Sequence, residues 1–539
     1  MSPTPPAPSR LAGALSSLRS LDASGGRAAD GRPRPATPPP GEAELTAEQA
    51  QAVGSGARLM KVQAFAGAGK TTMLRAFAER SREAQGLYLA FNQSIAKKAR
   101  ESFPQSVRCQ THNAMALRAL GARDAAWRGL PTGKLDQIQA RHIATLPGAA
   151  AHNLDLALAT LSRFIQSPDP ELDERHVAAQ EAQFLGLPPA ELDPRQATKF
   201  ARRCWQSMCD PASELPMPHD GYLKLWSIRP AQLGCDFVLI DEAQDSNPAF
   251  LAGMAQQRCR QIYVGDEHQG IYGFRGAVNA LSALTGHESR SLTLTHRFGP
   301  RLCDLANAIV SHKGSSLRMR PSPASPASQV VFGRAPLGLS PLYLARTNAG
   351  LFEEAFALAR AGKGFRLMGG ESKLGFPDLA DLVALASGSP AGRYAAYRDI
   401  DELEDAASAA GLADLALRAK LARSHGSQLP SMLEAINARL LGPEAAGSPT
   451  LSTLHQAKGL EADWVEILGD FAFAPAGAPA SDAAPMSSAQ SEECNVLYVA
   501  LTRAKTGLAI RSPDVSKWAR TVAETEIRSP EPEQDLFGS

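Results

Sequence analysis

The sequence predicts an α/β protein with two parallel-sheet domains, each interrupted by a mainly helical insertion. Short apolar runs alternate with helical patterns at residues 59–120, and the alternation returns at 235–298, 341–370 and 451–510. The stretches between them read as helices separated by polar or Pro-rich turns. These changes divide the chain into a first domain at 44–120 and 231–299 with its insertion at 121–230, a second domain at 300–370 and 448–520 with its insertion at 371–447, and two terminal segments at 1–43 and 521–539.

Composition restricts the class of protein. A chain of 539 residues with 44% hydrophobic content can build several folded cores. The net charge of +1 gives no overall basic signal, so a nucleic-acid surface must be local. Seven cysteines without a CxxC pair predict reduced thiols and no metal cluster, and no apolar run is long enough to cross a membrane. We expect a cytoplasmic protein of bacterial type that works at the nucleoid.

Both terminal segments have compositions that cannot bury a core. Residues 1–43 contain nine prolines, and residues 521–539 are acidic and contain further prolines. We predict that both segments are disordered.

The first domain begins with a helix and a phosphate-binding turn. Thr46 is placed as the N-cap of a helix, and Gln49 lies in its first turn, where it either caps the helix or reads a purine base through its amide. An apolar run then stops at a turn, after which Met73 begins an apolar helix face. Backbone N–H groups of such a turn surround phosphate, a lysine reaches the outer phosphates, and a threonine hydroxyl ligates Mg²⁺. The residues of the turn are Ala66, Gly67, Ala68, Gly69, Lys70, Thr71 and Thr72.

Two later strands of the first domain end in aromatic and polar residues. Phe91 and Asn92 follow the run 86–91 and precede a basic helix, a pattern that suits base stacking with phosphate contacts; a core Phe is the alternative. The run 107–111 ends at Thr111, and His112 follows it.

An acidic pair follows the next buried strand. Asp241 and Glu242 come directly after the apolar run 237–240. At the carboxyl end of a strand, Asp241 can hold Mg²⁺ and Glu242 can orient and deprotonate the attacking water. Together with the glycine-rich turn, the pair predicts a nucleoside triphosphatase site.

A third strand, 261–265, leads into an aromatic and Arg-bearing loop. Gln269 and Arg275 can face the γ-phosphate, while Phe274 can face a base. A following strand delivers Arg297.

The second domain lacks a phosphate-binding turn and contributes other polar residues. A polar loop between two apolar strands carries His455, Lys458 and Glu461, and a helix leading to the last strand carries Tyr498 and Arg503. An arginine delivered across a cleft stabilises the charge that develops on a transferring phosphoryl group, so ATP turnover would open and close the two domains.

The chain resembles the superfamily 1 DNA helicases of the UvrD/Rep type, and within them the helicase core of the F-box DNA helicases and their bacterial relatives. The resemblance covers residues 45–512 and rests on the motifs LTAEQ, AFAGAGKTT, YLAFNQSIAKKA, HDGYLKLW, IDEAQDSNP, GDEHQGIYGFRGA, HRFGP and LYVALTRAK. It implies two RecA-like domains, 1A and 2A, with insertions 1B and 2B. It also implies a 3′-to-5′ translocase that uses ATP and Mg²⁺ on single-stranded DNA or DNA with a 3′ tail, in repair or recombination.

The resemblance also implies roles for individual residues. Gln49 would bind adenine, and Glu461 would bond the ribose. Thr71 and Asp241 would hold the metal. The remaining nucleotide contacts and catalytic residues would be Lys70, Glu242, Gln269, Arg275, Arg297 and Arg503, and the DNA path would be lined by Phe91, Asn92, His112, Phe274 and His455. His296 stands where many relatives carry an aromatic residue that stacks on adenine, and Ala462 stands where many carry an aromatic after Glu461.

Two further readings stay open. Both insertions are short, which favours as an alternative a DNA-stimulated ATPase that displaces proteins from DNA, or serves in a repair or defence complex, with little unwinding alone. Near the C-terminus, Asp535, Leu536 and Phe537 resemble the short motif by which bacterial proteins dock on the sliding clamp. A chance pair of apolar residues is the competing explanation.

Overall fold

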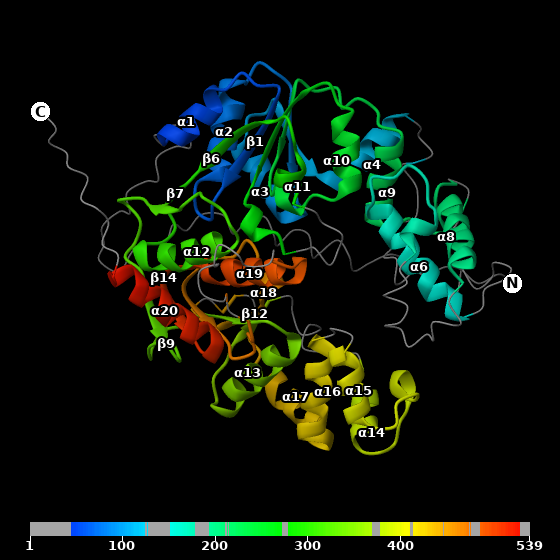
Figure 1. Ribbon diagram of the computed structural model, residues 1–539, viewed down its shortest axis with the longest axis vertical. Coiled ribbons are helices and arrows are strands. Elements are labelled where there is room, and N and C mark those ends of the chain that lie inside the picture. The colour runs from blue at the N-terminus through cyan, green and yellow to red at the C-terminus, as the bar shows by residue number, and fades with distance from the viewer. Residues whose placement is uncertain are drawn as a thin grey trace, which may run out of the picture. The chain divides into compact units, whose positions relative to one another are not determined.

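The computed structural model describes residues 45–123, 127, 151–177, 193–210, 213, 215–271, 279–368, 378–409, 413–442, 444–445, 447–473, 475 and 486–528. Two six-stranded sheets organise this part of the chain (Figure 1). Every strand pair in both sheets is parallel, which confirms the predicted α/β fold class.

The first sheet places the predicted phosphate turn and acidic pair on the same edge. Its strands run in the order β3 (Val107–Thr111), β2 (Gly86–Ala90), β4 (Phe237–Ile240), β5 (Arg260–Gly265), β1 (Leu59–Ala64) and β6 (Glu288–Leu292). Strands β2 and β4 are buried along their whole length, because helices cover both faces of a parallel sheet. Because β5 lies between β1 and β4, one strand separates the phosphate turn from the acidic pair.

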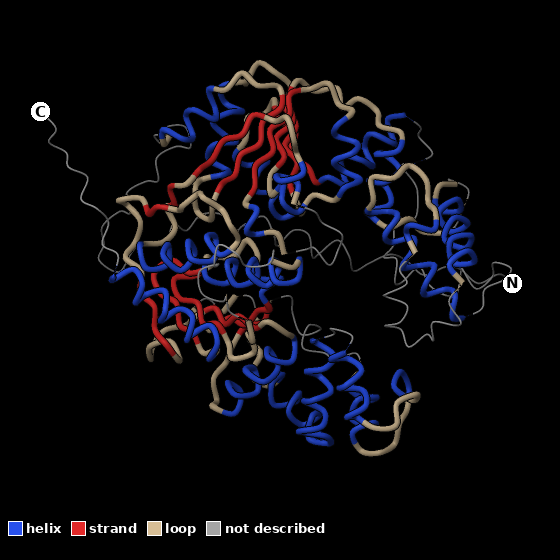
Figure 2. Tube along the Cα trace, in the orientation of Figure 1, coloured by secondary structure: helices blue, strands red, loops and turns tan. Residues whose placement is uncertain are grey.

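The second sheet has the order β11 (Arg366–Leu367), β12 (Thr450–Thr453), β10 (Leu342–Ala345), β13 (Ala462–Ile467), β14 (Ala504–Ile510) and β9 (Gln329–Phe332). A short pair, β7 (Leu294–Thr295) and β8 (Arg320–Pro321), is also parallel. Figure 2 shows the strands in red between blue helices.

Helices connect the strands of the first sheet. They are α1 (Ala47–Gly54), α2 (Lys70–Arg80), α3 (Gln93–Ser102), α4 (His112–Arg123), α10 (Pro248–Ala255) and α11 (Ala280–Ala283). Between β3 and β4 the described chain also forms α6 (Ala151–Gln166), α8 (Pro194–Met208) and α9 (His219–Ile228).

The second sheet is served by α12 (Pro300–His312), α13 (Asn348–Arg360), α18 (Leu454–Ala457), α19 (Ser488–Leu501) and α20 (Pro513–Arg528). Between β11 and β12 lie α14 (Leu379–Ala386), α15 (Ile400–Ala409), α16 (Ala413–His425) and α17 (Leu429–Asn437). None of the helices in the described part of the chain is both long and apolar enough to cross a membrane.

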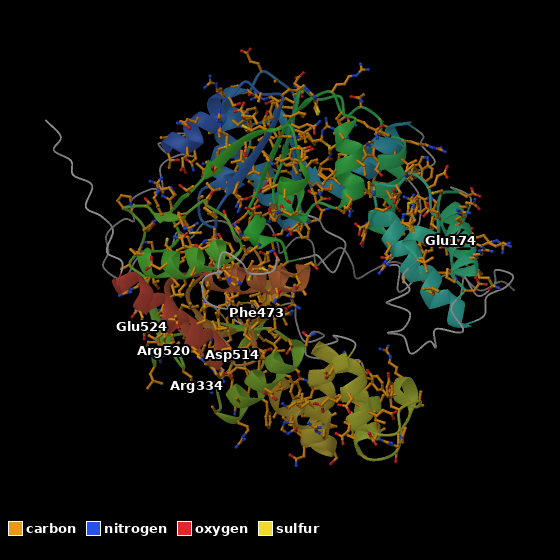
Figure 3. All side chains as sticks on the ribbon, in the orientation of Figure 1. Glu174, Arg334, Phe473, Asp514, Arg520 and Glu524 are labelled. Carbon is orange, nitrogen blue, oxygen red and sulfur yellow. The ribbon has the colours of Figure 1, made fainter. Side chains whose placement is uncertain are left out.

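Two expectations about the C-terminal region were wrong. Helix α20 continues to Arg528, so the predicted disordered tail cannot begin at 521. The helix persists because Val515, Trp518 and Ala519 pack into the core of the second sheet, with Val522 against it. Figure 3 labels Arg520 and Glu524 on this helix, and the Arg520 guanidinium lies 3.9 Å from the centre of the Phe332 ring. The preceding helix ends at Leu501, so Arg503 follows it and Lys505 lies on β14.

One hydrophobic core contains residues that follow strands of both sheets. Phe65, Ala66 and Ile271 belong to the same buried cluster as α12, β13, β14 and α19. The start of the phosphate turn, at Phe65 and Ala66, is therefore part of a hydrophobic core built mainly by the elements of the second sheet.

Candidate functional site

The glycines of the turn between β1 and α2 adopt a backbone that other residues avoid. Gly67 and Gly69 both have φ of +76°. A Cβ at Gly67 would lie 2.5 Å from Thr295 Oγ1 and 2.6 Å from Arg297 Cβ. Helix α2 begins at Lys70, so its first N–H groups open toward the turn. The local geometry suits a bound phosphate.

The Gln49 side chain lies beneath this turn. Thr46 Oγ1 accepts a hydrogen bond from Gln49 N at 3.2 Å, which confirms the predicted N-cap. Gln49 Oε1 accepts from Thr46 N at 3.0 Å, and Nε2 donates to Ala68 O at 3.1 Å. The amide is buried and ties α1 to the turn, so the reading of a purine by Gln49 stays a prediction.

A cavity of about 540 Å³ opens between the phosphate turn and the loops of the second sheet. It joins residues that are up to several hundred positions apart in the sequence. Of the residues predicted to bind nucleotide or to act in catalysis, those lining it are Gly67, Ala68, Gly69, Lys70, Thr71, Thr72, Asp241, Glu242, Gln269, His296, Arg297, Glu461 and Arg503. Phe91, Asn92, Asp245 and Lys458 also contribute. Ala66 is buried behind the turn, and Arg275 and Phe274 lie outside the described residues.

The acidic pair has two different electrostatic environments. Burial, reinforced by Glu242, raises the pKa of Asp241 to about 6, and Tyr88 donates its hydroxyl proton to Asp241 Oδ2 at 2.5 Å. Burial also acts to raise the pKa of Glu242, but Lys70 and Lys458 outweigh it and hold that pKa below its ordinary value. Lys70 Nζ lies 4.0 Å from Glu242 Oε1. Glu242 is thus ionised near neutral pH, and its carboxylate oxygens are available to accept hydrogen bonds.

Glu242 also carries backbone strain. Its φ of +52° makes it the single non-glycine residue with a positive φ in the described ranges. Side chains disfavour this left-handed region, and such residues persist where the surrounding structure holds them. Here the Glu242 N–H donates to Asp241 Oδ1 at 2.9 Å and Gln244 Nε2 donates to its carboxylate.

Two arginines complete the cavity: Arg297, which follows β7 and lies beside the phosphate turn, and Arg503, which precedes β14 of the second sheet. Arg503 is buried, and its Nη2 donates to Gln269 Oε1 at 3.0 Å. Burial, and secondly Arg297, lower the pKa of Arg503 to about 9. Arg297 Nη1 donates to Thr502 O at 2.8 Å. The two arginines therefore concentrate positive charge around the phosphate turn.

Glu461 pairs with cations here. It forms an ion pair with Arg297, and Lys505 Nζ lies 3.4 Å from its Oε2. Burial raises the pKa of Glu461, but Arg297 and Lys505 bring it below the ordinary value. The proposed ribose contact of Glu461 is untested by this arrangement.

A second cavity, of about 520 Å³, adjoins the first. Phe91, Asn92 and Asp245 line both cavities. Further polar and aromatic groups come from the starts of α4 and α9. These are Thr111, His112, Asn113, His219, Asp220 and Tyr222.

His112 is neutral in this second cavity. Its ring stacks on Phe250 with 4.1 Å between ring centres, and burial lowers its pKa to about 4. Asn92 caps α3, because its Oδ1 accepts from Ile95 N at 2.9 Å. His455, which was predicted in a loop, lies on α18 and lines neither of these two cavities.

Sequence reasoning missed several residues that hold the site together. Tyr88 contacts Asp241, Lys458 forms an ion pair with Asp245, and Tyr498 contacts Asp266. Tyr88 lies in an apolar strand and Tyr498 in an apolar helix, so the local pattern does not indicate the partner of either hydroxyl. The repeated polar residues in IDEAQD and GDEHQ were the available signal for Asp245 and Asp266.

Comparison with known proteins finds that one segment in each of the two sheets is similar to a helicase domain. Residues 230–285 match the UvrD/REP helicase N-terminal domain, and residues 427–513 match the UvrD-like helicase C-terminal domain. The first match contains β4 and β5, and the second contains β12, β13 and β14.

Curated relatives agree with these matches. F-box DNA helicase 1 of Gallus gallus is 29% identical over 497 residues, which cover 86% of this chain and 48% of that protein. F-box DNA helicase protein 1 of Schizosaccharomyces pombe is 29% identical over 511 residues, which cover 84% of this chain and 55% of that protein. ATP-dependent DNA helicase UvrD2 of Mycobacterium tuberculosis is 27% identical over 56% of this chain. The chain spans about half the length of these relatives. Its residues 230–285 and 427–513 are similar to the N-terminal and C-terminal domains of the UvrD-like helicases.

Proposed function

We propose that the chain is an ATP-dependent translocase on single-stranded DNA that unwinds duplexes in the 3′-to-5′ direction during repair or recombination. The observation that carries this proposal is the cavity in which the phosphate turn, the acidic pair and Arg503 meet. A site shared by two sheets changes when nucleotide binds or leaves, which is what a stepping protein requires.

ATP fits the donors that face the cavity. Backbone N–H groups of the turn and Lys70 would hold its phosphates, since both are donors without acceptor capacity. The Thr71 hydroxyl and the Asp241 carboxylate are the oxygen ligands that Mg²⁺ prefers, and they would hold the ion with the phosphates. When bound, the ion neutralises charge on the phosphates. Among the described residues no group of three or more His, Cys, Asp or Glu side chains could hold a metal ion.

Hydrolysis then follows from the residues already placed. The ionised Glu242 carboxylate would accept a hydrogen bond from the attacking water and orient it, and it would take the proton as the water attacks. Arg503 and Arg297 would stabilise the charge that develops on the γ-phosphate. Gln269 contacts Arg503 and so is placed to report whether that phosphate is present.

Single-stranded DNA would lie in the second cavity. Phe91 offers a ring for base stacking, and neutral His112 and Asn113 can bond base edges. Phe274 and His455 remain proposed contacts. Because Phe91, Asn92 and Asp245 border both cavities, a nucleotide-driven movement would reach the strand directly.

The first test is steady-state ATP hydrolysis by the whole chain, with and without single-stranded DNA, with Glu242→Gln and Lys70→Ala as blanks. We expect strong stimulation by DNA that both variants lose. Turnover that ignores DNA would contradict the proposal. Duplexes with a 3′ or a 5′ tail then report polarity.

The alternative function is displacement of proteins from DNA without useful unwinding. Streptavidin release from biotinylated single strands, compared with unwinding of a tailed duplex, separates the two. Stimulated ATPase with release but no unwinding would favour the alternative.

Docking on a sliding clamp is a separate proposal that rests on Asp535, Leu536 and Phe537, which lie outside the described residues. We expect a pull-down with a bacterial clamp to retain the wild-type chain. The Leu536→Ala/Phe537→Ala variant should be lost from the pull-down, and unchanged retention would remove the proposal.

A further inference from the structure

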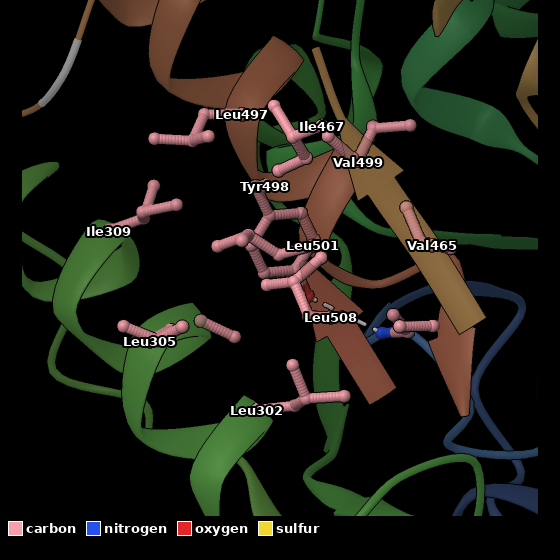
Figure 4. Close-up of a cluster of buried hydrophobic side chains, with 14 of the residues drawn as sticks. Leu302, Leu305, Ile309, Val465, Ile467, Leu497, Tyr498, Val499, Leu501 and Leu508 are labelled. Atoms are coloured by element: carbon pink, nitrogen blue, oxygen red, sulfur yellow. Dashed lines mark hydrogen bonds between the residues drawn. The ribbon is translucent and has the colours of Figure 1, made fainter. Parts of the chain in front are cut away.

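The hydroxyl of Tyr498 joins α19 to two parts of the first sheet. It donates to Asp266 Oδ2 at 2.9 Å and accepts from the Ala66 N–H at 3.4 Å. Tyr498 has no exposed surface and belongs to the buried hydrophobic cluster that also contains Leu302, Leu305 and Leu508 (Figure 4). A hydroxyl buried in such a cluster is costly unless it is hydrogen-bonded, so these two partners fix its position.

Asp266 accepts hydrogen bonds from several groups around the loop after β5. Its Oδ2 also accepts from Gln269 Nε2 at 2.7 Å, while its Oδ1 accepts from Gln63 Nε2 and His268 N, both at 3.1 Å. Asp266 is fully buried. One carboxylate therefore binds the strand that leads to the phosphate turn, the loop after β5, and α19.

This arrangement sets the orientation of the Gln269 amide. Both oxygens of Asp266 act as acceptors toward Tyr498, Gln63 and the His268 N–H, so this carboxylate faces the NH₂ group of Gln269. The amide oxygen then points the other way and accepts from Arg503 Nη2 at 3.0 Å. If the amide were reversed, two acceptors would meet at Asp266 and two donors would meet at Arg503.

We propose that Tyr498 is a positioning residue for ATP hydrolysis, which couples the phosphate turn to Gln269 and Arg503 through Asp266. This inference rests on the proposed function and extends it to a residue outside the lining of the nucleotide cavity. The Tyr498 hydroxyl contacts the phosphate turn directly and Arg503 through Asp266 and Gln269. This chain of hydrogen bonds would keep the turn and Arg503 in the same relative position when the two sheets move.

The test removes the hydroxyl and keeps the ring, in the variant Tyr498→Phe. We expect kcat to fall about tenfold or more, because small displacements of catalytic groups carry large rate penalties. The dissociation constant of a fluorescent non-hydrolysable ATP analogue should change by less than about twofold, since the binding groups remain. Equal losses in binding and turnover, or an unchanged kcat, would overturn the proposal.

Tyr263→Phe is the matched control. Tyr263 is also a buried tyrosine of the chain, and its hydroxyl donates to Gln261 Oε1 at 2.7 Å, away from the cavity. It should keep the wild-type kcat. A similar loss in both variants would show that any missing internal hydrogen bond slows the enzyme, and would overturn the assignment to Tyr498.

A double variant separates positioning from packing. If Tyr498 acts through Gln269, removal of its hydroxyl should cost nothing further in a Gln269→Ala background. Multiplicative losses in kcat would overturn this route.

Amide hydrogen exchange gives a readout that does not need turnover. In Tyr498→Phe, segments 62–70 and 266–271 should exchange faster than in the wild type, because both lose a bond to the hydroxyl. Unchanged exchange in both segments would overturn the proposal. A wild-type chain without ATPase activity would contradict the proposed function, whereas exchange would still decide whether this hydroxyl holds the turn.

Discussion

Lys458, from the loop after α18 of the second sheet, forms a buried ion pair with Asp245, which follows β4 of the first sheet. The two side chains are 9% and 0% exposed. Lys458 Nζ also donates to Gln269 O at 2.7 Å. Burial raises the pKa of Asp245 to about 6, although Lys458 acts to lower it. The pair lies where the two cavities adjoin, because Asp245 lines both.

Loss of the Asp245 charge should destabilise the chain. Asp245→Asn removes the carboxylate that forms the buried ion pair with Lys458, and we expect a loss of about 3 kcal/mol in the free energy of unfolding. Urea unfolding measures it, with exposed Asp463→Asn as the control for charge. The Asp245→Asn/Lys458→Met double variant should recover part of the loss. No recovery would show that the pair is not the source.

Arg503 should matter for turnover more than for binding. In Arg503→Ala, we expect hydrolysis of ATP to fall by on the order of 10³-fold, because the arginine acts on charge that develops in the transition state. Arg503→Lys should recover only part of the rate, since it lacks the planar fork. Arg520→Ala, an exposed cation over Phe332, serves as the control. Wild-type turnover in Arg503→Ala would refute the two-sheet mechanism.

Gly67 should tolerate no side chain. Gly67→Ala places a Cβ against Thr295 and Arg297 and strains a φ of +76°, so the turn must move and nucleotide binding should be lost. Gly286→Ala is the control, because Gly286 has a similar φ of +73° with open space around its Cβ. Binding of a fluorescent ATP analogue reports the difference. Equal affinities for the two variants would contradict the steric account.

His112 should make the chain less stable in mild acid. Its pKa is about 4 in the folded chain and 6.5 in the unfolded one, so the unfolded chain binds the proton first as pH falls. This residue alone should remove about 2 kcal/mol of stability between pH 7.5 and pH 5. His112→Phe keeps the stacking on Phe250 and should reduce the pH dependence by that amount in urea unfolding. An unchanged dependence would mean that His112 does not titrate this way.

The parts of the site that are contiguous in sequence were predictable, and the parts that join distant segments were not. The turn from Ala66 to Thr72 has its own pattern of glycines, and Asp241 and Glu242 follow a recognisable buried strand. Tyr498 and Ala66 are separated by 432 positions, and no local pattern specifies their hydrogen bond. The prediction ended the second domain at 520 because the following residues are acidic and contain prolines, and this composition hid Val522, which packs against the core.

The path of the chain between β3 and β4 has a mechanical consequence. The chain leaves β3 through α4 and returns to β4 after α9, and these two helices pack together beside β2. A force on the helices between α4 and α9 is transmitted to the first sheet at two points. One of these points is His112, which lines the second cavity, and the other is β4, which Asp241 follows directly. A mechanical load on the insertion would therefore reach the second cavity and the acidic pair together.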